Sequence, residues 1–219
     1  MAVRIEFTNS KSLTDLDSYI SRLQRFGFAD SRLLRSGDTL SVFGCLQAAG
    51  SLTDTTSTVL VLKSFALAPS PTVSESSQVD SVVLLQSLRD RLARLTEHDT
   101  VLQLPDTETH ASWAGVLPPK SGWQKWYEIE TASLKHVAQD AILRVKSRTE
   151  GFTSSVMVEA VRREVLNTEI APQLPLAAAY ACETMGLFTD TEVFNVYKQA
   201  SWVMLRAGHG DVIIRQHHG

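Results

Sequence analysis

The side chains best suited to metal binding or proton transfer gather in one segment of this sequence. Asp106, Glu108 and His110 alternate along the chain, and Glu97-His98-Asp99 lies shortly before them. On an extended strand the alternating residues would share one side, as oxygen and imidazole ligands of a metal must. A loop does not impose this geometry, and acidic loop residues are usually solvated. We therefore keep these groups, with His98, as the alternative hypothesis of an enzyme whose composite site lies between two halves of the chain.

Other reactive constellations are weaker. His136 and Asp140 stand four residues apart on an expected helix, a spacing that is typical of a hydrogen bond on the helix surface. The sequence has no Gly-x-Ser-x-Gly, no Gly-x-x-x-x-Gly-Lys-Ser/Thr, no Gly-x-Gly-x-x-Gly, no His-Glu-x-x-His and no Cys-x-x-Cys. This pattern favours a protein that is not an enzyme, and it predicts no catalytic, metal-binding or cofactor-binding residue and no cofactor.

The most distinctive segment is rich in tryptophan and proline. Three of the four tryptophans fall within residues 98–129, which prolines and glycines interrupt. Tryptophan is enriched at binding hot spots, but aromatic rings also pack on proline. A long irregular segment needs apolar anchors to be ordered, which favours packing. As a candidate interaction surface the segment offers Trp113, Pro118, Pro119, Trp123 and Trp126.

Composition excludes several classes of protein. The chain has 219 residues, of which 43% are hydrophobic and 21% charged, and its formal net charge is −3. These values are typical of globular proteins. A charge this close to zero makes nucleic acid an unlikely partner. With no apolar window of about 18 residues, no signal peptide and only two cysteines, we expect a cytoplasmic protein without a membrane segment.

The amino-terminal part predicts a helix followed by an antiparallel sheet. Apolar residues at helical spacing indicate a helix over 13–27, with Ser12 as its N-cap. A turn at Gly37-Asp38 precedes a strand over 39–47, and an apolar run predicts an interior strand over 58–68. Leucines at helical spacing then predict a second helix over 80–95, packed on the sheet rather than in a coiled coil.

The carboxy-terminal part predicts three helices, over 130–149, 153–167 and 174–188. Residues 191–207 fit either a further helix or two strands, Val193–Lys198 and Trp202–Arg206. We favour strands, because Asp211–Arg215 is itself strand-like and Gly208-His209-Gly210 suits a hairpin turn.

The predicted fold class is therefore α+β, with an amino-terminal helix and antiparallel sheet and a carboxy-terminal helical bundle that ends in a small antiparallel sheet. The predicted domains are 1–97, the connecting loop 98–129, and 130–219. Three helices before a β-hairpin is also the order of a winged helix, which gives a transcription-associated protein as another alternative. Its reading helix should be basic, yet Leu176–Met185 carries only Glu183 as a charged residue.

Several segments together resemble a family of uncharacterised proteins of high-GC Gram-positive (actinobacterial) bacteria. The strongest is Trp113-Ala114-Gly115-Val116-Leu117-Pro118-Pro119 with Ser121-Gly122-Trp123. Others are Leu33-Leu34-Arg35 before Val42-Phe43-Gly44, Val59–Lys63, Leu176–Phe188, and Trp202–Arg206 before Gly210-Asp211-Val212-Ile213-Ile214. The family has no assigned activity and supplies no catalytic residues. The resemblance implies a bacterial cytoplasmic protein and supports strands at the carboxyl end.

These observations predict a non-catalytic interaction or scaffold protein that acts through apolar contacts, with a protein partner or with a second copy of itself. Such a protein should expose an apolar patch. We expect that patch to include Leu85, Leu92 or the tryptophan segment.

Overall fold

The chain divides into two compact units. The structure, a computed structural model, describes residues 3–51, 54–69, 79–106, 108–188 and 191–216. The first unit is Met1–Cys45 with Leu62–Val116, and the second is Leu46–Val61 with Leu117–Gly219. Both units combine helices with antiparallel strands, which confirms the predicted α+β class. That 1–97 and 130–219 fold as separate domains stays a prediction.

The strands of the first unit follow the order β5-β2-β3-β4. They are β2 (Asp30–Ser36), β3 (Thr39–Gln47), β4 (Thr58–Ala66) and β5 (Asp80–Leu84). The predicted turn at Gly37-Asp38 joins β2 to β3, where Ser36 pairs with Thr39. A separate two-stranded sheet pairs β1 (Arg4–Glu6) with β6 (Val101–Gln103).

Helices α1 (Ser10–Arg25) and α2 (Leu85–Leu92) bury their apolar faces in this unit. Leu16, Ile20 and Leu23 of α1 are at most 1% exposed. A Cβ atom at Gly44 of β3 would lie 2.7 Å from Leu23 Cδ2, so glycine allows the helix its close approach to the strand. The N-cap of α1 is Asn9 rather than Ser12, because the Asn9 side chain accepts a hydrogen bond from the Ser12 N–H.

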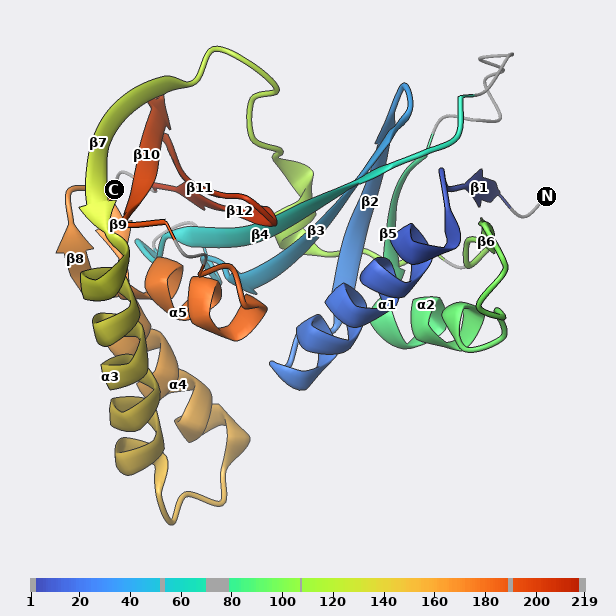
Figure 1. The fold of residues 1–219 in the computed structure, drawn as a ribbon. Coiled ribbons are helices and arrows are strands. Elements are labelled where there is room, and N and C mark those ends of the chain that lie inside the picture. Colours follow the sequence, from blue (N-terminus) through green and yellow to red (C-terminus); the bar gives the residue numbers. More distant parts are fainter. Residues whose placement is uncertain (1–2, 52–53, 70–78, 107, 189–190, 217–219) are drawn as a thin grey trace. The chain divides into compact units, whose positions relative to one another are not determined.

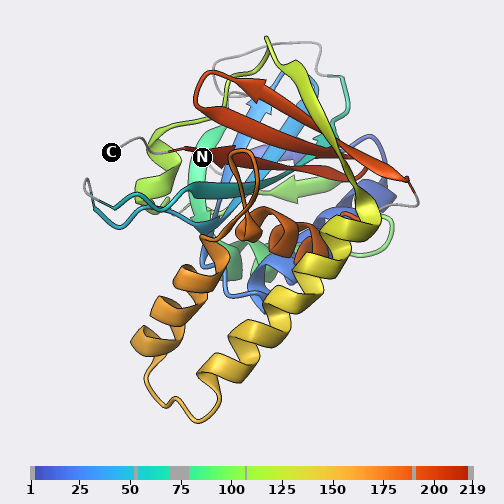
Figure 2. The same ribbon diagram turned by 90° about the vertical axis from the view of Figure 1, so that its left-hand side faces the viewer.

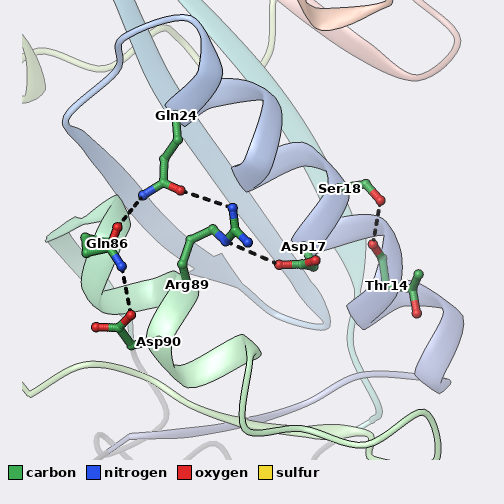
Figure 3. Close-up of polar contacts among 7 residues, drawn as sticks. All are labelled: Thr14, Asp17, Ser18, Gln24, Gln86, Arg89 and Asp90. Atoms are coloured by element: carbon green, nitrogen blue, oxygen red, sulfur yellow. Dashed lines mark hydrogen bonds and ion pairs between the residues drawn. The ribbon is translucent and has the colours of Figure 1, made fainter.

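Polar side chains connect the solvent sides of α1 and α2 (Figure 3). Gln24 of α1 donates to Gln86 of α2 at 3.3 Å and accepts a hydrogen bond from Arg89 at 3.3 Å. Arg89 also lies 3.8 Å from a carboxylate oxygen of Asp17. On their outer sides, α1 and α2 are therefore joined by polar contacts within the first unit.

Two predictions for residues 80–95 are wrong. Residues 80–84 form strand β5 rather than the start of a helix, because the β-branched Val82 and Val83 pair with β2. Leu85 and Leu92 are 1% and 7% exposed, so they are core residues and cannot belong to an exposed patch. Their packing on the sheet, as the leucine spacing predicted, is confirmed.

The strands of the second unit follow the order β4-β12-β11-β10-β7. They include β7 (Gln124–Glu130), β10 (Val193–Gln199), β11 (Trp202–Ala207) and β12 (Gly210–Arg215). The favoured strands at the carboxyl end are confirmed, and the alternative helix over 191–207 is wrong. The predicted small sheet is extended by β4 and β7. Segment 98–129 is not irregular throughout, since it also contains β6 and a 3₁₀ turn at Ser112–Gly115.

The helices of the second unit are α3 (Thr131–Thr149), α4 (Ser155–Leu166) and α5 (Leu176–Met185). A short hairpin of β8 (Glu169–Ala171) and β9 (Leu174–Pro175) precedes α5. Eight of the ten residues of α5 are buried. The winged-helix alternative is therefore wrong, because its reading helix would be α5, and a buried helix cannot enter a DNA groove.

Among the helices in the described ranges, none is long and apolar enough to cross a membrane.

Candidate interaction surface

Helices α3 and α4 form a hairpin that extends away from the strands of the second unit (Figure 1). The buried residues of α3 are Thr131, Leu134, Ala138 and Ala141, all in its amino-terminal part. Figure 2 shows α5 lying beside this end of α3. From residue 142 to residue 160 no side chain is buried. The outer part of the hairpin is therefore supported by its two helices alone.

This outer part carries a concentration of exposed apolar side chains. Half of the ten large hydrophobic residues that are exposed in the described chain lie here. We call them the hairpin surface: Ile142 (37% exposed), Leu143 (64%), Phe152 (39%), Val156 (76%) and Met157 (53%). Single exposed apolar residues are common on globular proteins, but an exposed group of them makes the hairpin a candidate interaction site.

An ion pair joins the two helices of the hairpin. Arg148 of α3 donates to both carboxylate oxygens of Glu164 in α4, at 3.0 and 2.9 Å. This hydrogen bonding, with the opposite charge, lowers the pKa of Glu164 and raises that of Arg148. The contact joins α3 to α4, the two helices that carry the exposed apolar residues.

A loop of the second unit contacts α4 at Arg163, the residue next to Glu164. The Asp54 carboxylate accepts hydrogen bonds from the backbone N–H of Gly50 at 2.7 Å and of Thr56 at 2.9 Å, and lies 3.5 Å from Arg163. The hydrogen bond from Gly50 first, then those from Thr56, with the Arg163 charge, lower the pKa of Asp54 to about 2. Asp54 is thus charged at neutral pH and holds Arg163 near the loop.

An open groove of about 950 Å³ runs along α4 beside this loop. Its lining is mixed and belongs mainly to α4: Thr56, Ser155, Val156, Glu159, Ala160, Arg163, Glu164, Asn167 and Thr168. Val156 belongs to both the groove and the hairpin surface. The groove therefore places polar and charged groups of α4 next to the hairpin surface.

The predicted tryptophan and proline surface is distributed over both units. Trp113 lies in the first unit, where its indole N–H donates to Asp30 at 2.9 Å. Trp123 lies in the second unit and donates to the Pro119 carbonyl at 3.0 Å, and Pro118 and Pro119 are half-buried. These contacts support the packing interpretation of the segment. The use of these residues as an interaction surface stays a prediction.

Gly122 explains the close fit of the Pro-Pro-x-x-Gly-Trp segment. Its φ of +86° is a conformation that favours glycine. A Cβ atom there would lie 2.7 Å from Nε2 in the side chain of Gln199. Trp126 differs from the other tryptophans, because it lies on β7 with 39% of its surface exposed and Lys198 4.3 Å above its ring.

The candidate enzyme residues are exposed. His98, Asp106, Glu108 and His110 all lie at the surface, and Asp106 is 3.8 Å from Arg91. Within the described residues no three His, Cys, Asp or Glu side chains come close enough to hold a metal ion. His136 and Asp140 lie 3.8 Å apart on the surface of α3, which is longer than the predicted hydrogen bond.

Sequence reasoning missed the hairpin surface. A signal was present, because Leu143 lies on the opposite side of the helix from the stripe of Leu134, Ala138 and Ala141. An apolar residue on the polar side of an amphipathic helix indicates a contact outside the core.

Comparisons with known proteins define the class of fold. Residues 118–219 match a domain of unknown function, DUF8185. No curated protein matches the sequence. The fold is similar to that of bacterial sliding clamps. The similar structures include the DNA polymerase III subunit beta of Pseudomonas aeruginosa (TM-score 0.51, 11% identity), that of Caulobacter crescentus (0.52, 10%) and that of Streptococcus pyogenes (0.51, 11%).

The similarity covers 100% of this chain and 65%, 66% and 65% of those three chains. This chain therefore spans just under two thirds of their length. At identities this low the likeness concerns the fold alone.

Proposed function

We propose that this chain is a non-catalytic interaction protein that uses a clamp-like fold as a scaffold and binds a protein partner through apolar contacts. The observation that carries the proposal is the hairpin surface, whose apolar side chains remain between 37% and 76% exposed. Burying such side chains in a complex removes apolar area from water, which drives association. The similar structures are named as polymerase subunits, which agrees with a role in an assembly.

Protein is favoured over nucleic acid as the partner, although α3 carries Lys135, Arg144, Lys146 and Arg148 against Asp140 alone. Arg148 is engaged by Glu164, and over residues 131–166 the excess of positive charge is only +2. Groups so nearly balanced give little of the phosphate attraction on which DNA binding depends. We also propose a cytoplasmic location, since two cysteines fall short of a secreted disulfide framework.

Site-specific photo-crosslinking tests the proposal. A photoreactive amino acid replaces Leu143 or Met157 of the hairpin surface, or Val116, which is 44% exposed and lies in the first unit, as the control. We expect one protein to be cross-linked in cells from the two hairpin positions and not from Val116. Its identity is then read by mass spectrometry.

The captured protein is next purified and titrated with the wild-type chain and with Leu143→Asp. We expect the substitution to raise the Kd at least about tenfold, as the loss of a buried apolar contact does. Equal cross-linking from all three positions, or an unchanged Kd, would contradict the proposal. Binding of duplex DNA at low salt that Lys146→Glu abolishes would instead make nucleic acid the partner.

A further inference from the structure

Strand β7 is an edge strand with unusual exposure. It ends the strand order of the second unit, and no described strand pairs with its outer side. Five of its seven residues are exposed and none is buried. An edge strand presents a row of N–H and C=O groups that can pair with another strand. Strand β5 ends the order at the other side, but its Val82 carbonyl already accepts a hydrogen bond from the Thr109 N–H at 2.8 Å.

A β-bulge changes which residues of β7 share a face. Tyr127 pairs with Val196 and Lys125 pairs with Tyr197, so Trp126 is the extra residue. Lys125 and Glu128 therefore lie on one face, where their side chains form an ion pair. Tyr127 and Ile129 lie on the other face, opposite the buried Val196 and Phe194.

We propose that β7 pairs antiparallel with β7 of a second copy of this chain, so that two copies associate about a two-fold axis. Directly opposed residues of an antiparallel pair lie on the same face. Because the bulge shifts the alternation of faces, a residue before Trp126 and a residue after it can share a face although their numbers differ by an odd number. In a symmetric pair such residues can therefore oppose each other. The longest such register places Lys125 opposite Glu128 of the second copy, and Gln124 opposite Ile129.

Charge complementarity makes a second copy the best occupant of this edge. The register creates two Lys–Glu pairs per dimer on the solvent face, because each pair occurs twice about the axis. It also brings Trp126 to the Tyr127 of the second copy, and aromatic pairs stabilise cross-strand contacts. The same strand thus supplies both partners of each contact. This inference goes beyond the proposed partner binding and uses a different surface.

Charge-reversal variants test the pairing by sedimentation equilibrium. Lys125→Glu leaves two acidic groups on each edge, and Glu128→Lys leaves two basic groups. Either variant alone places like charges opposite each other, and we expect its dimer Kd to rise at least about tenfold over that of the wild type. An equimolar mixture of the two variants restores opposite charges across the axis, and we expect a mixed dimer with a Kd near the wild-type value.

The mixture separates the contact between copies from the ion pair within one chain, since Lys125 and Glu128 no longer attract each other in either variant. Lys120→Glu and Glu150→Lys, at exposed positions outside β7, control for net charge and should dimerise like the wild type. A wild-type chain that stays monomeric at high concentration would overturn the inference. So would single variants that dimerise normally, or a mixture no tighter than its components.

The two surfaces can fail separately. Leu143→Asp should weaken partner binding and leave the dimer unchanged, and Lys125→Glu should do the reverse. Loss of both properties in a properly folded Lys125→Glu chain would contradict the separate roles given to β7 and the hairpin surface.

Discussion

Both units place helices against antiparallel strands, and the units differ in how the outer sides of these helices are covered. In the first unit α1 and α2 bury their leucines, and Gln24, Gln86 and Arg89 connect their polar sides. In the second unit α3 packs on α5 through small residues such as Ala138 and Ala141, which are fully buried. Helix α3 then continues for two turns beyond its last buried residue, where α4 joins it.

The helices of the two units therefore differ in how many apolar side chains they leave exposed. Small residues let helices approach closely, and Ile142 and Leu143, which follow Ala141 in α3, remain exposed. In the first unit, polar side chains of α1 and α2 form hydrogen bonds with each other on the outer side of the helix pair. In the hairpin of the second unit, apolar side chains remain exposed. Four predictions test this difference between the units.

The largest expected effect lies within α3 itself. Leu134→Ala removes a fully buried side chain and should lower the free energy of unfolding by about 2–5 kcal/mol. Leu143→Ala, nine residues further along the same helix and 64% exposed, should change it by less than about 0.5 kcal/mol. Urea denaturation of both variants measures the difference, and similar losses would contradict the exposed position of Leu143.

The second prediction concerns the loop that anchors α4. In the unfolded chain the pKa of Asp54 is about 3.9. As the pH falls, Asp54 therefore takes up a proton in the unfolded chain at a higher pH than in the folded chain. The stabilisation by Asp54 is therefore complete above pH 4 and is lost as the pH falls through about 2. Asp54→Asn should lower the free energy of unfolding at pH 7 by about 1–2 kcal/mol, because some contact with water weakens the pairing.

Denaturation of wild type and Asp54→Asn between pH 2 and pH 7 provides the measurement. The two curves should converge toward pH 2. A constant difference across this range would show that Asp54 does not stabilise the fold through its charge.

The third prediction compares helix caps. Asn9→Ala should lower the free energy of unfolding by about 1 kcal/mol, since the side chain caps α1. Ser154, the N-cap residue of α4, makes no side-chain capping bond, and Ser154→Ala should have a smaller effect. Thermal unfolding of the two variants tests whether the hairpin helix begins with less support than α1.

The smallest change in the free energy of unfolding should follow from removing the polar contacts between α1 and α2. Arg89→Ala removes the contacts with Gln24 and Asp17, and we expect a loss of about 0.5–1 kcal/mol because the side chain is 40% exposed. The neighbouring exposed Arg94 provides the control as Arg94→Ala. A loss equal to that of Leu134→Ala would mean that polar contacts, rather than apolar burial, hold the helices of the first unit.

The sequence by itself determined the class of the elements and most of their positions. Apolar spacing located α1, α3, α4 and α5, and the turn at Gly37-Asp38 located the first hairpin. The choice of strands for Val193–Lys198 and Trp202–Arg206 was also available from local pattern. These features depend on residues that are close together in the sequence, so the sequence alone is enough to predict them.

Only the tertiary structure decided which apolar residues are core and which are exposed. Ala138 and Ile142 lie four residues apart on one side of α3, yet the first is fully buried and the second is 37% exposed. The difference depends on whether a second element covers the residue, which local sequence does not encode. The same reason hid the edge position of β7, because a strand is an edge only when no other segment of the chain pairs with it.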